Sequence, residues 1–362
     1  MIVSHLIATK NQFWKSWSTK PGRSARAIPE STAAREWIKP RFTGFNMFQS
    51  ERITFGAKVQ TFNTFRHGAR PKSPFEFPQS KNLVLGRILS FALRAPWKRG
   101  CLFWLRFAAN PIVTMRWWRF LSNFTAAGEY PAPHDDLLQK PLSKFLVHGM
   151  PRSLRLELLA NHFQIAEGIF SRDSLMRLWQ GDRLHMGVIE GRNESYSCHI
   201  ALADRLGGRH EGAFAVRLVR TRDMALLCVG RFILVHQGLH GRYTFVVGSM
   251  QGPRKGKRLI VDATRDLFGV RPKEAILMVL QGLTLEGGTA HFLAVSENRQ
   301  PIQYRRSKRR SMLRSDINGF WAERSATPEN TYGFMVPKSA VVGADGRSRS
   351  KACFHTIGEL FY

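Results

Sequence analysis

Strand-like runs with a period of two dominate the middle of this sequence and constrain its fold more than any other feature. They cover residues 195–204, 211–220, 224–235 and 243–252, and turn-rich stretches such as GGRHEG and HQGLHG separate them. Alternation is typical of strands, and loops this short join strands that run antiparallel. The pattern therefore predicts an antiparallel meander.

The stretch VVGSMQGPRKGKRLIVDATRDLFGVRPKEAIL, which overlaps the last run, predicts two helices after a glycine-rich basic turn. The first helix spans about 256–268, and the second begins near Pro272 and ends at Gly287-Gly288. The second is apolar on nearly all sides, which predicts a buried helix. A strand at 290–297 follows. We therefore predict an α+β fold, a mostly antiparallel sheet flanked by helices, with a basic helical N-terminal part.

Changes in composition divide the chain into four parts. Residues 1–80 hold 13 Lys+Arg and 4 acids without any persistent period, which predicts a disordered basic arm, although Met47 is an alternative start. Residues 81–183 form a basic helical region, residues 184–340 the α+β core, and residues 341–362 a C-terminal tail.

The charge balance indicates which partners the protein attracts. The chain carries 55 Lys+Arg against 26 Asp+Glu, a net charge of +29, so polyanions are the expected partners. The strongest patch is 81–125, where bases alternate with Trp, Phe and Leu and no acid occurs between Glu76 and Glu129. This pattern predicts contact with an anionic membrane surface. The alternative is a set of basic helices packed on the domain with their Arg side chains facing water.

Several classes of protein find no support in the sequence. No apolar run is long enough to span a bilayer, so we expect a cytoplasmic protein, peripheral at the inner membrane. The four cysteines are far apart and match neither a disulfide framework nor a zinc site, and no other metal-ligand spacing occurs. RRSKRR at 305–310 keeps nucleic-acid binding as an alternative, but no helix-turn-helix, RNP-type or zinc-finger pattern accompanies it.

Motifs in a fixed order give the chain a resemblance. They are Gln251-Gly252, Ala263-Thr264-Arg265, Gly269-Val270-Arg271-Pro272-Lys273, Val295-Ser296 and Asn318-Gly319-Phe320-Trp321, preceded by Asn161-His162-Phe163 and Glu211-Gly212. Over about 85–340 the chain resembles the bacterial VirK/YbjX family, a domain of unknown function. It departs from the family's pattern where Glu297 intrudes after Ser296 and where Ile317-Asn318 replaces a Tyr-Asp pair.

The resemblance implies a biological setting rather than a reaction. It implies a role in the bacterial envelope and in virulence, through surface-protein display or resistance to cationic antimicrobial peptides. It supplies no catalytic residues. An acyltransferase and a nucleic-acid-binding protein therefore remain alternative functions.

The basic turn after the last run is the best candidate for a ligand site. A meander, a strand ending in a glycine turn, a helix and a further strand resemble a GNAT-type acyltransferase core, where backbone N–H groups at a helix N-terminus hold the pyrophosphate of coenzyme A. The GNAT pattern Gln/Arg-x-x-Gly-x-Gly/Ala is half matched, because Arg254 replaces its first glycine. The alternative is a tight corner. The candidate ligand-binding residues are Gln251, Gly252, Arg254, Lys255, Gly256, Arg271 and Lys273, and the candidate cofactor is a coenzyme A thioester.

Candidates for a general base rest on residue type alone. His162, Glu211 and His199 are the candidates. His162 lies beside an apolar helical face, where a histidine is more often part of the core. Glu211 begins a strand, where a carboxylate is more often a solvated charge.

Overall fold

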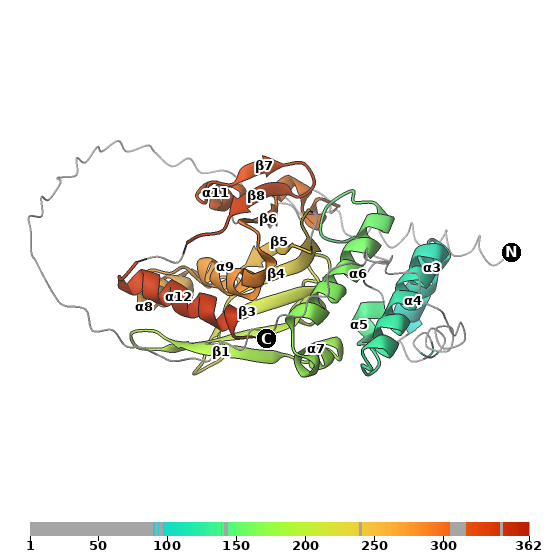
Figure 1. The fold of residues 1–362 in the computed structure, drawn as a ribbon, viewed down its shortest axis with the longest axis horizontal. Helices are drawn as coiled ribbons and strands as arrows, with labels where there is room; N and C mark the ends of the chain where they lie inside the picture. The colour runs from blue at the N-terminus through green and yellow to red at the C-terminus, as the bar shows by residue number, and fades with distance from the viewer. Residues whose placement is uncertain are drawn as a thin grey trace, which may run out of the picture. The chain divides into compact units, whose positions relative to one another are not determined.

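One mixed sheet organises the part of the chain that the structure describes (Figure 1). The structure is a computed structural model that describes residues 90, 93, 97–138, 140, 144–238, 241–304, 316–340 and 343–361. All of them belong to one compact unit, residues 67–362. The predictions for residues 1–80 and for 305–310 lie outside the described residues.

Eight strands form this sheet, in the order β1-β2-β3-β4-β5-β6-β8-β7 among the described residues. The strands are β1 (Leu184–Glu190), β2 (Ser195–Leu202), β3 (Phe214–Arg220), β4 (Leu226–His236), β5 (Tyr243–Gln251), β6 (His291–Val295), β7 (Thr327–Glu329) and β8 (Gly333–Pro337). From β1 to β5 every neighbouring pair is antiparallel. The α+β class and the meander are confirmed. β1, β7 and β8 are strands that the pattern analysis did not delimit.

β5 and β6 are parallel, so the chain has to cross back between them. Two helices make this crossover, α8 (Lys257–Asp266) and α9 (Pro272–Leu283). The other helices are α3 (Trp97–Ala108), α4 (Pro111–Ala127), α5 (Asp135–Leu138), α6 (Arg152–Ile169), α7 (Arg172–Trp179), α11 (Ile317–Ala322) and α12 (Gly346–Glu359). None of the described helices is both long and apolar enough to cross a bilayer.

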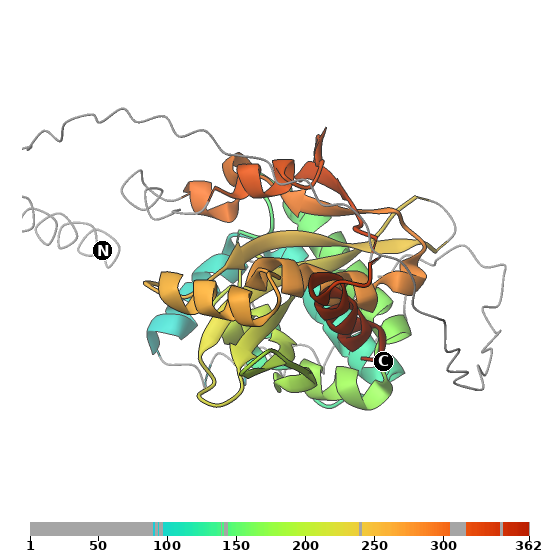
Figure 2. The same cartoon turned by 90° about the vertical axis from the view of Figure 1, so that its left-hand side faces the viewer.

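α9 is the buried helix that the sequence predicted. Every residue from Ala275 to Leu283 is buried. α9 crosses α12 at a very short distance, because a Cβ on Gly282 would lie 2.0 Å from the His355 carbonyl oxygen and one on Gly358 would lie 2.0 Å from that of Val279. The segment assigned as a C-terminal tail thus contains a helix that packs on the core (Figures 1 and 2).

α6 and α9 cover the same face of the sheet. The His162 ring in α6 contacts Phe214 in β3 at 4.5 Å between centroids. Two residues further along β3, Val216 pairs with Gly230, whose missing side chain leaves room for Ile276 of α9. Because alternate residues of a strand share a face, both helices lie on the side of Phe214 and Val216. We call this the helix face. The other is called the open face because neither α6 nor α9 lies on it, although side chains there such as Ala215 and Arg231 are buried.

α3 and α4 form a helical hairpin whose inner side is aromatic. Phe103 of α3 stacks on Trp118 of α4 at 5.5 Å. The indole N–H groups of Trp117 and Trp118 donate to the carbonyl oxygens of Leu137 and Leu138, at 2.7 and 2.9 Å. Each buried indole therefore keeps its hydrogen bond. The break between the two helices falls before Pro111, the first residue of α4.

Candidate functional site

The sheet opens between its two parallel strands. β6 pairs with β5 only at Val246 and Val247 among the described residues, although β5 continues to Gln251. Gly248 is an extra residue in the ladder, because Arg231 pairs with Ser249 and Phe232 with Val247. A bulge of this kind bends a strand. β6 ends at Val295, one residue past its last pair, so the last four residues of β5 have no strand partner on this edge in the described part of the chain. We call this unpaired stretch the split.

Gly248 is required at this bulge by close packing. A Cβ on Gly248 would lie 1.7 Å from the carbonyl oxygen of Glu211, which no side chain permits. The loop before β3 therefore lies directly against the point at which β5 leaves β6. This loop delivers Glu211 to the open face beside the split.

A cavity of about 360 Å³ lies at the end of β5 on the helix face. This volume is within the range of small-molecule sites. Its walls come from the beginning of β4, from α8, from the N-terminus of α9 and from α11, and its lining includes Leu227, Cys228, Gly252, Lys273 and Phe320. Burial raises the pKa of the Cys228 thiol to about 12, so this sulfur is neutral and unsuited to nucleophilic attack.

Lys273 supplies this cavity with positive charge. It occupies the first turn of α9, after Pro272, where the backbone N–H groups already favour an anion. No carboxylate oxygen of the described residues lies within ion-pairing distance of it, and its Nζ lies 5.1 Å from the centre of the Phe320 ring. Burial lowers the pKa of Lys273. Asp316, which also lines the cavity, acts against this shift and raises the pKa of Lys273.

A polar cluster lies on the open face at the same end of β5. The Glu211 carboxylate accepts hydrogen bonds from Ser249 Oγ at 2.6 Å and from Arg231 Nη1 at 3.0 Å. The Gln251 side-chain amide lies 3.4 Å from both carboxylate oxygens. Arg231 is buried and also donates to the Leu206 carbonyl at 2.9 Å. The cluster fixes the bent end of β5, and it brings together two predicted site residues, Glu211 and Gln251.

Successive residues at the end of β5 point to opposite faces of the sheet, so the predicted residues of the turn do not all reach the same site. Gln251 points to the Glu211 cluster, and the next residue, Gly252, lines the cavity on the helix face. Arg254 and Lys255 are exposed and do not line this cavity. Gly256 precedes α8 as its N-cap without a side-chain cap. The turn thus delivers one residue to the cavity, and Arg271 and Lys273 come from α9 and the residue before it.

The histidine candidates lie apart from the cavity. His162 is fully buried, its Nδ1 accepts the Leu234 backbone N–H at 3.0 Å, and burial lowers its pKa to about 3. It is the core histidine that the alternative interpretation described. His199 lies on the open face of β2, 3.1 Å from Ser197 Oγ, and burial lowers its pKa to about 4. Neither histidine lines the cavity at the end of β5.

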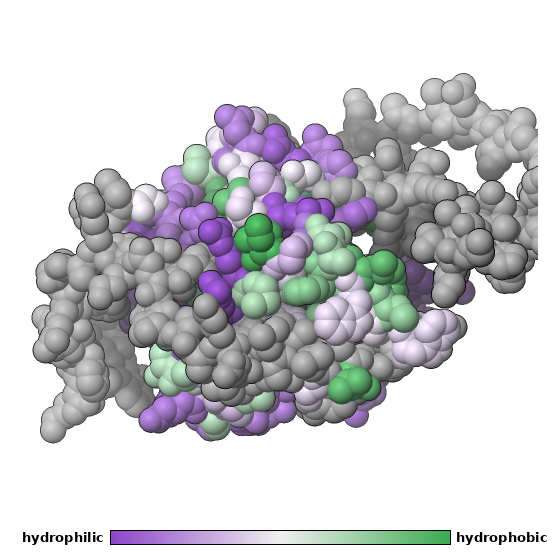
Figure 3. All heavy atoms as spheres, turned by 90° about the vertical axis from the view of Figure 1, so that its right-hand side faces the viewer, coloured by the Kyte–Doolittle hydropathy of each residue, from purple (hydrophilic) through white to green (hydrophobic). Residues whose placement is uncertain are grey.

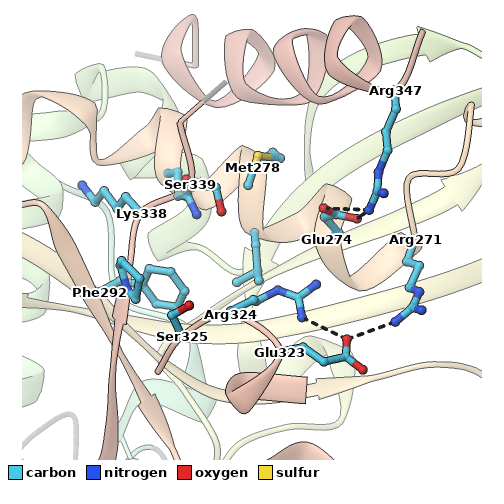
Figure 4. A pocket seen from close by; sticks show the side chains of 13 residues that line it. Arg271, Glu274, Met278, Phe292, Glu323, Arg324, Ser325, Lys338, Ser339 and Arg347 are labelled. Atoms are coloured by element: carbon cyan, nitrogen blue, oxygen red, sulfur yellow. Dashed lines mark hydrogen bonds and ion pairs between the residues drawn. The ribbon is translucent and has the colours of Figure 1, made fainter. Parts of the chain in front are cut away.

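A larger cavity of about 430 Å³ adjoins the first and shares Arg271 and Glu323 with it (Figure 4). Its charged groups neutralise one another except for Lys338, whose Nζ donates to the Thr284 carbonyl oxygen at 3.0 Å. Arg271 and Arg324 lie 3.3 and 3.8 Å from Glu323, and Arg347 and Lys351 lie 3.0 and 2.7 Å from Glu274. The smaller cavity is the better candidate for an anionic ligand because its lysine, Lys273, lies in the first turn of α9, where the backbone N–H groups add to the positive charge.

Three residues of the site escaped the sequence analysis as functional positions: Arg231, Ser249 and Phe320. Arg231 and Ser249 lie within apolar runs that were assigned only as strands. A polar residue at a buried position of such a run is the feature that marks them, since buried charge has to be paired. Phe320 was part of a recognised motif, but its contact with Lys273 joins α11 to α9 and has no trace in local sequence.

The fold and the cavity define an α+β protein with one candidate site for an anionic ligand. Residues 94–342 match the family described as "Protein of unknown function (DUF535)", which is more than half of the chain. The chain therefore belongs to the DUF535 family. No curated protein and no solved structure matches it.

Proposed function

We propose that this protein is an acyltransferase that uses an acyl-coenzyme A donor. The observation that carries the proposal is the split between β5 and β6, with a cavity on one face and a polar cluster on the other. Beyond Val247 no strand of the described residues pairs with this edge of β5, and the proposal places an extended ligand along it. The pantetheine arm of coenzyme A carries amide groups that match such an edge.

The donor enters from the helix face. Its phosphates lie at the N-terminus of α9, where Lys273 adds a positive charge to the backbone N–H groups. Gly252 lets the ligand approach the end of β5, and Phe320 closes the opposite wall of the cavity. The thioester then lies in the split, beside Gly248. This assignment uses Gly252 and Lys273 of the predicted ligand residues, with Arg254 and Lys255 as outer contacts.

The acceptor reaches the thioester from the open face. There Glu211 is the carboxylate nearest the bulge, held by Ser249 and Arg231. In this proposal Glu211 orients the Gln251 side chain and neutralises the positive charge of an acceptor amine. Transfer then breaks the C–S bond of the thioester, forms a bond from the carbonyl carbon to the acceptor atom, and releases the coenzyme A thiol with the acceptor's proton.

The biological setting that we propose is maintenance of the bacterial envelope. The resemblance to VirK/YbjX proteins supports it, with display of surface proteins and resistance to cationic peptides as its outcomes. The chain's net charge of +29 supports it as well, because inner-membrane surfaces are anionic. This setting would make an envelope component the acceptor.

Calorimetric titration of the full chain with coenzyme A tests the donor site. We expect measurable binding by the wild type, and binding at least about tenfold weaker for Lys273→Gln, because one charge-assisted contact contributes about 1.5–3 kcal/mol. Arg349→Gln is the matched control, since Arg349 is exposed on α12, outside both cavities. No heat with the wild type, or equal binding by Lys273→Gln, would contradict the proposal.

A further inference from the structure

The α3–α4 hairpin exposes apolar side chains that the core does not cover. Five of the large exposed hydrophobic residues of the described chain lie on it: Trp97 74%, Leu102 51%, Trp104 40%, Leu105 68% and Ile112 71%. Figure 3, which faces the side on which α3 and α4 lie in Figure 1, shows hydrophobic residues gathered there. Single exposed hydrophobic residues are ordinary, but a contiguous group marks an interaction surface.

Most of the exposed residues of α3 follow a helical stripe, while Leu102 lies outside it. Trp97, Cys101, Trp104, Leu105 and Ala108 are exposed, and at 3.6 residues per turn they fall within an arc of about 100°. The buried Phe103 lies on the opposite side, against Trp118. α3 thus turns an apolar stripe outward while a separate aromatic contact fixes it to α4.

Positive charge lies next to this apolar surface. On α4 the exposed residues Ile112, Arg116 and Arg119 are spaced by four and three, so they share one face of the helix. No acidic residue occurs between Glu76 and Glu129, so nothing in this segment offsets the charge. Apolar side chains flanked by uncompensated bases match an anionic bilayer, where the stripe enters the acyl boundary and arginines meet lipid phosphates.

We propose that the outward stripe of α3, together with Ile112, Arg116 and Arg119 of α4, docks the protein on an anionic membrane surface. The complementary charge decides the occupant, because a protein partner or a second copy of this basic chain would have to bring its own acidic surface. Docking is peripheral, since a single helix stripe lies in the interface rather than across it. The proposal stands independently of acyl transfer.

Co-sedimentation of the full chain with vesicles tests this. We expect binding to vesicles of mixed phosphatidylglycerol and phosphatidylcholine, weaker binding to phosphatidylcholine alone, and a decline with added salt. Trp97→Ser/Leu105→Ser should reduce partitioning by about tenfold or more, as should Arg116→Glu/Arg119→Glu. The four substituted side chains are all exposed, so the variants should fold.

Matched controls separate the stripe from general stickiness and charge. Leu285→Ser/Leu360→Ser removes two exposed leucines elsewhere, and Arg205→Glu/Arg349→Glu makes the same charge change elsewhere. Both controls should bind as the wild type does. Unchanged vesicle binding by the α3 and α4 variants would overturn the proposal. Conversion of a dimer to a monomer by these variants in light scattering, without loss of vesicle binding, would identify a self-association surface instead.

Discussion

α3 and α9 are both twelve-residue helices rich in large apolar residues, but they differ in how much of their apolar surface is buried. α9 is buried from Ala275 to Leu283, between the sheet and α12. α3 buries Phe103 and leaves Trp97 and Leu105 in solvent. The difference shows that apolar composition alone does not determine which surface a helix packs against. For α9 that surface is the sheet, and for α3 we propose that it lies outside the protein.

Leucine truncation in the two helices should give the largest contrast. Leu280→Ala in α9 removes a fully buried side chain and should lower the free energy of unfolding by about 2–5 kcal/mol. Leu105→Ala in α3 should change it by no more than about 0.5 kcal/mol, because that side chain is 68% exposed. Urea denaturation of both variants measures the contrast. Equal losses would mean that α3 is part of the folded core.

His162 extends the comparison to a buried helix that carries a titratable group. Its pKa is about 3 in the folded protein, below the ordinary 6.5, so only the unfolded chain takes up a proton as the pH falls through 6.5. The contribution of the neutral ring to the free energy of unfolding is therefore fully present above pH 6.5 and declines as the pH falls from 6.5 to 3. The loss from pH 7 to pH 5 should be about 2 kcal/mol.

His162→Asn isolates this contribution. An asparagine oxygen can replace Nδ1 as the acceptor for the Leu234 N–H, and it does not titrate in this range. The difference in unfolding free energy between the wild type and this variant should therefore change with pH. A constant difference from pH 7 to pH 5 would show that the buried ring is not neutral in the folded state.

Lys273 should give the smallest effect, and of the opposite sign. Lys273→Met removes a charge that burial and the helix dipole both disfavour, so the free energy of unfolding at neutral pH should rise by about 0.5 kcal/mol. Thermal unfolding in the absence of ligand measures this rise. A marked loss of stability would indicate that the contact with Phe320 holds α11 in place. Lys273 would then be structural rather than a ligand residue.

The elements that local pattern determines were predictable from the sequence. The alternation of β2 to β5, the glycine and proline limits of α9, and the proline break before α4 all follow from the chain's own chemistry. The limits of α8 and α9 were each placed a few residues too far, because Leu267 and Thr284 already leave the helices. β7 and β8 escaped because short strands carry little periodicity.

The site was only half predictable for a physical reason. Gly252 and Lys273 were identified from a turn and a helix start, which are local features. The register shift at Gly248, the Glu211–Ser249–Arg231 contacts and the approach of Phe320 to Lys273 join segments that are distant in sequence. Such contacts depend on which strands become neighbours. The sequence likewise allowed two roles for the apolar residues of α3, packing on the domain or contact with a membrane. Only the contact of Phe103 with Trp118 shows which side of the helix packs on the protein.

The four cysteines provide the protein with a natural chemical label. Cys198 and Cys228 are buried, and burial raises the pKa of each thiol to about 12, so alkylating reagents should not modify them at neutral pH. Cys101 and Cys353 are exposed. Replacing Cys353 by Ser would leave one reactive sulfur, within the outward stripe of α3. A polarity-sensitive dye attached there would report, by the colour of its emission, whether that helix faces water or hydrocarbon.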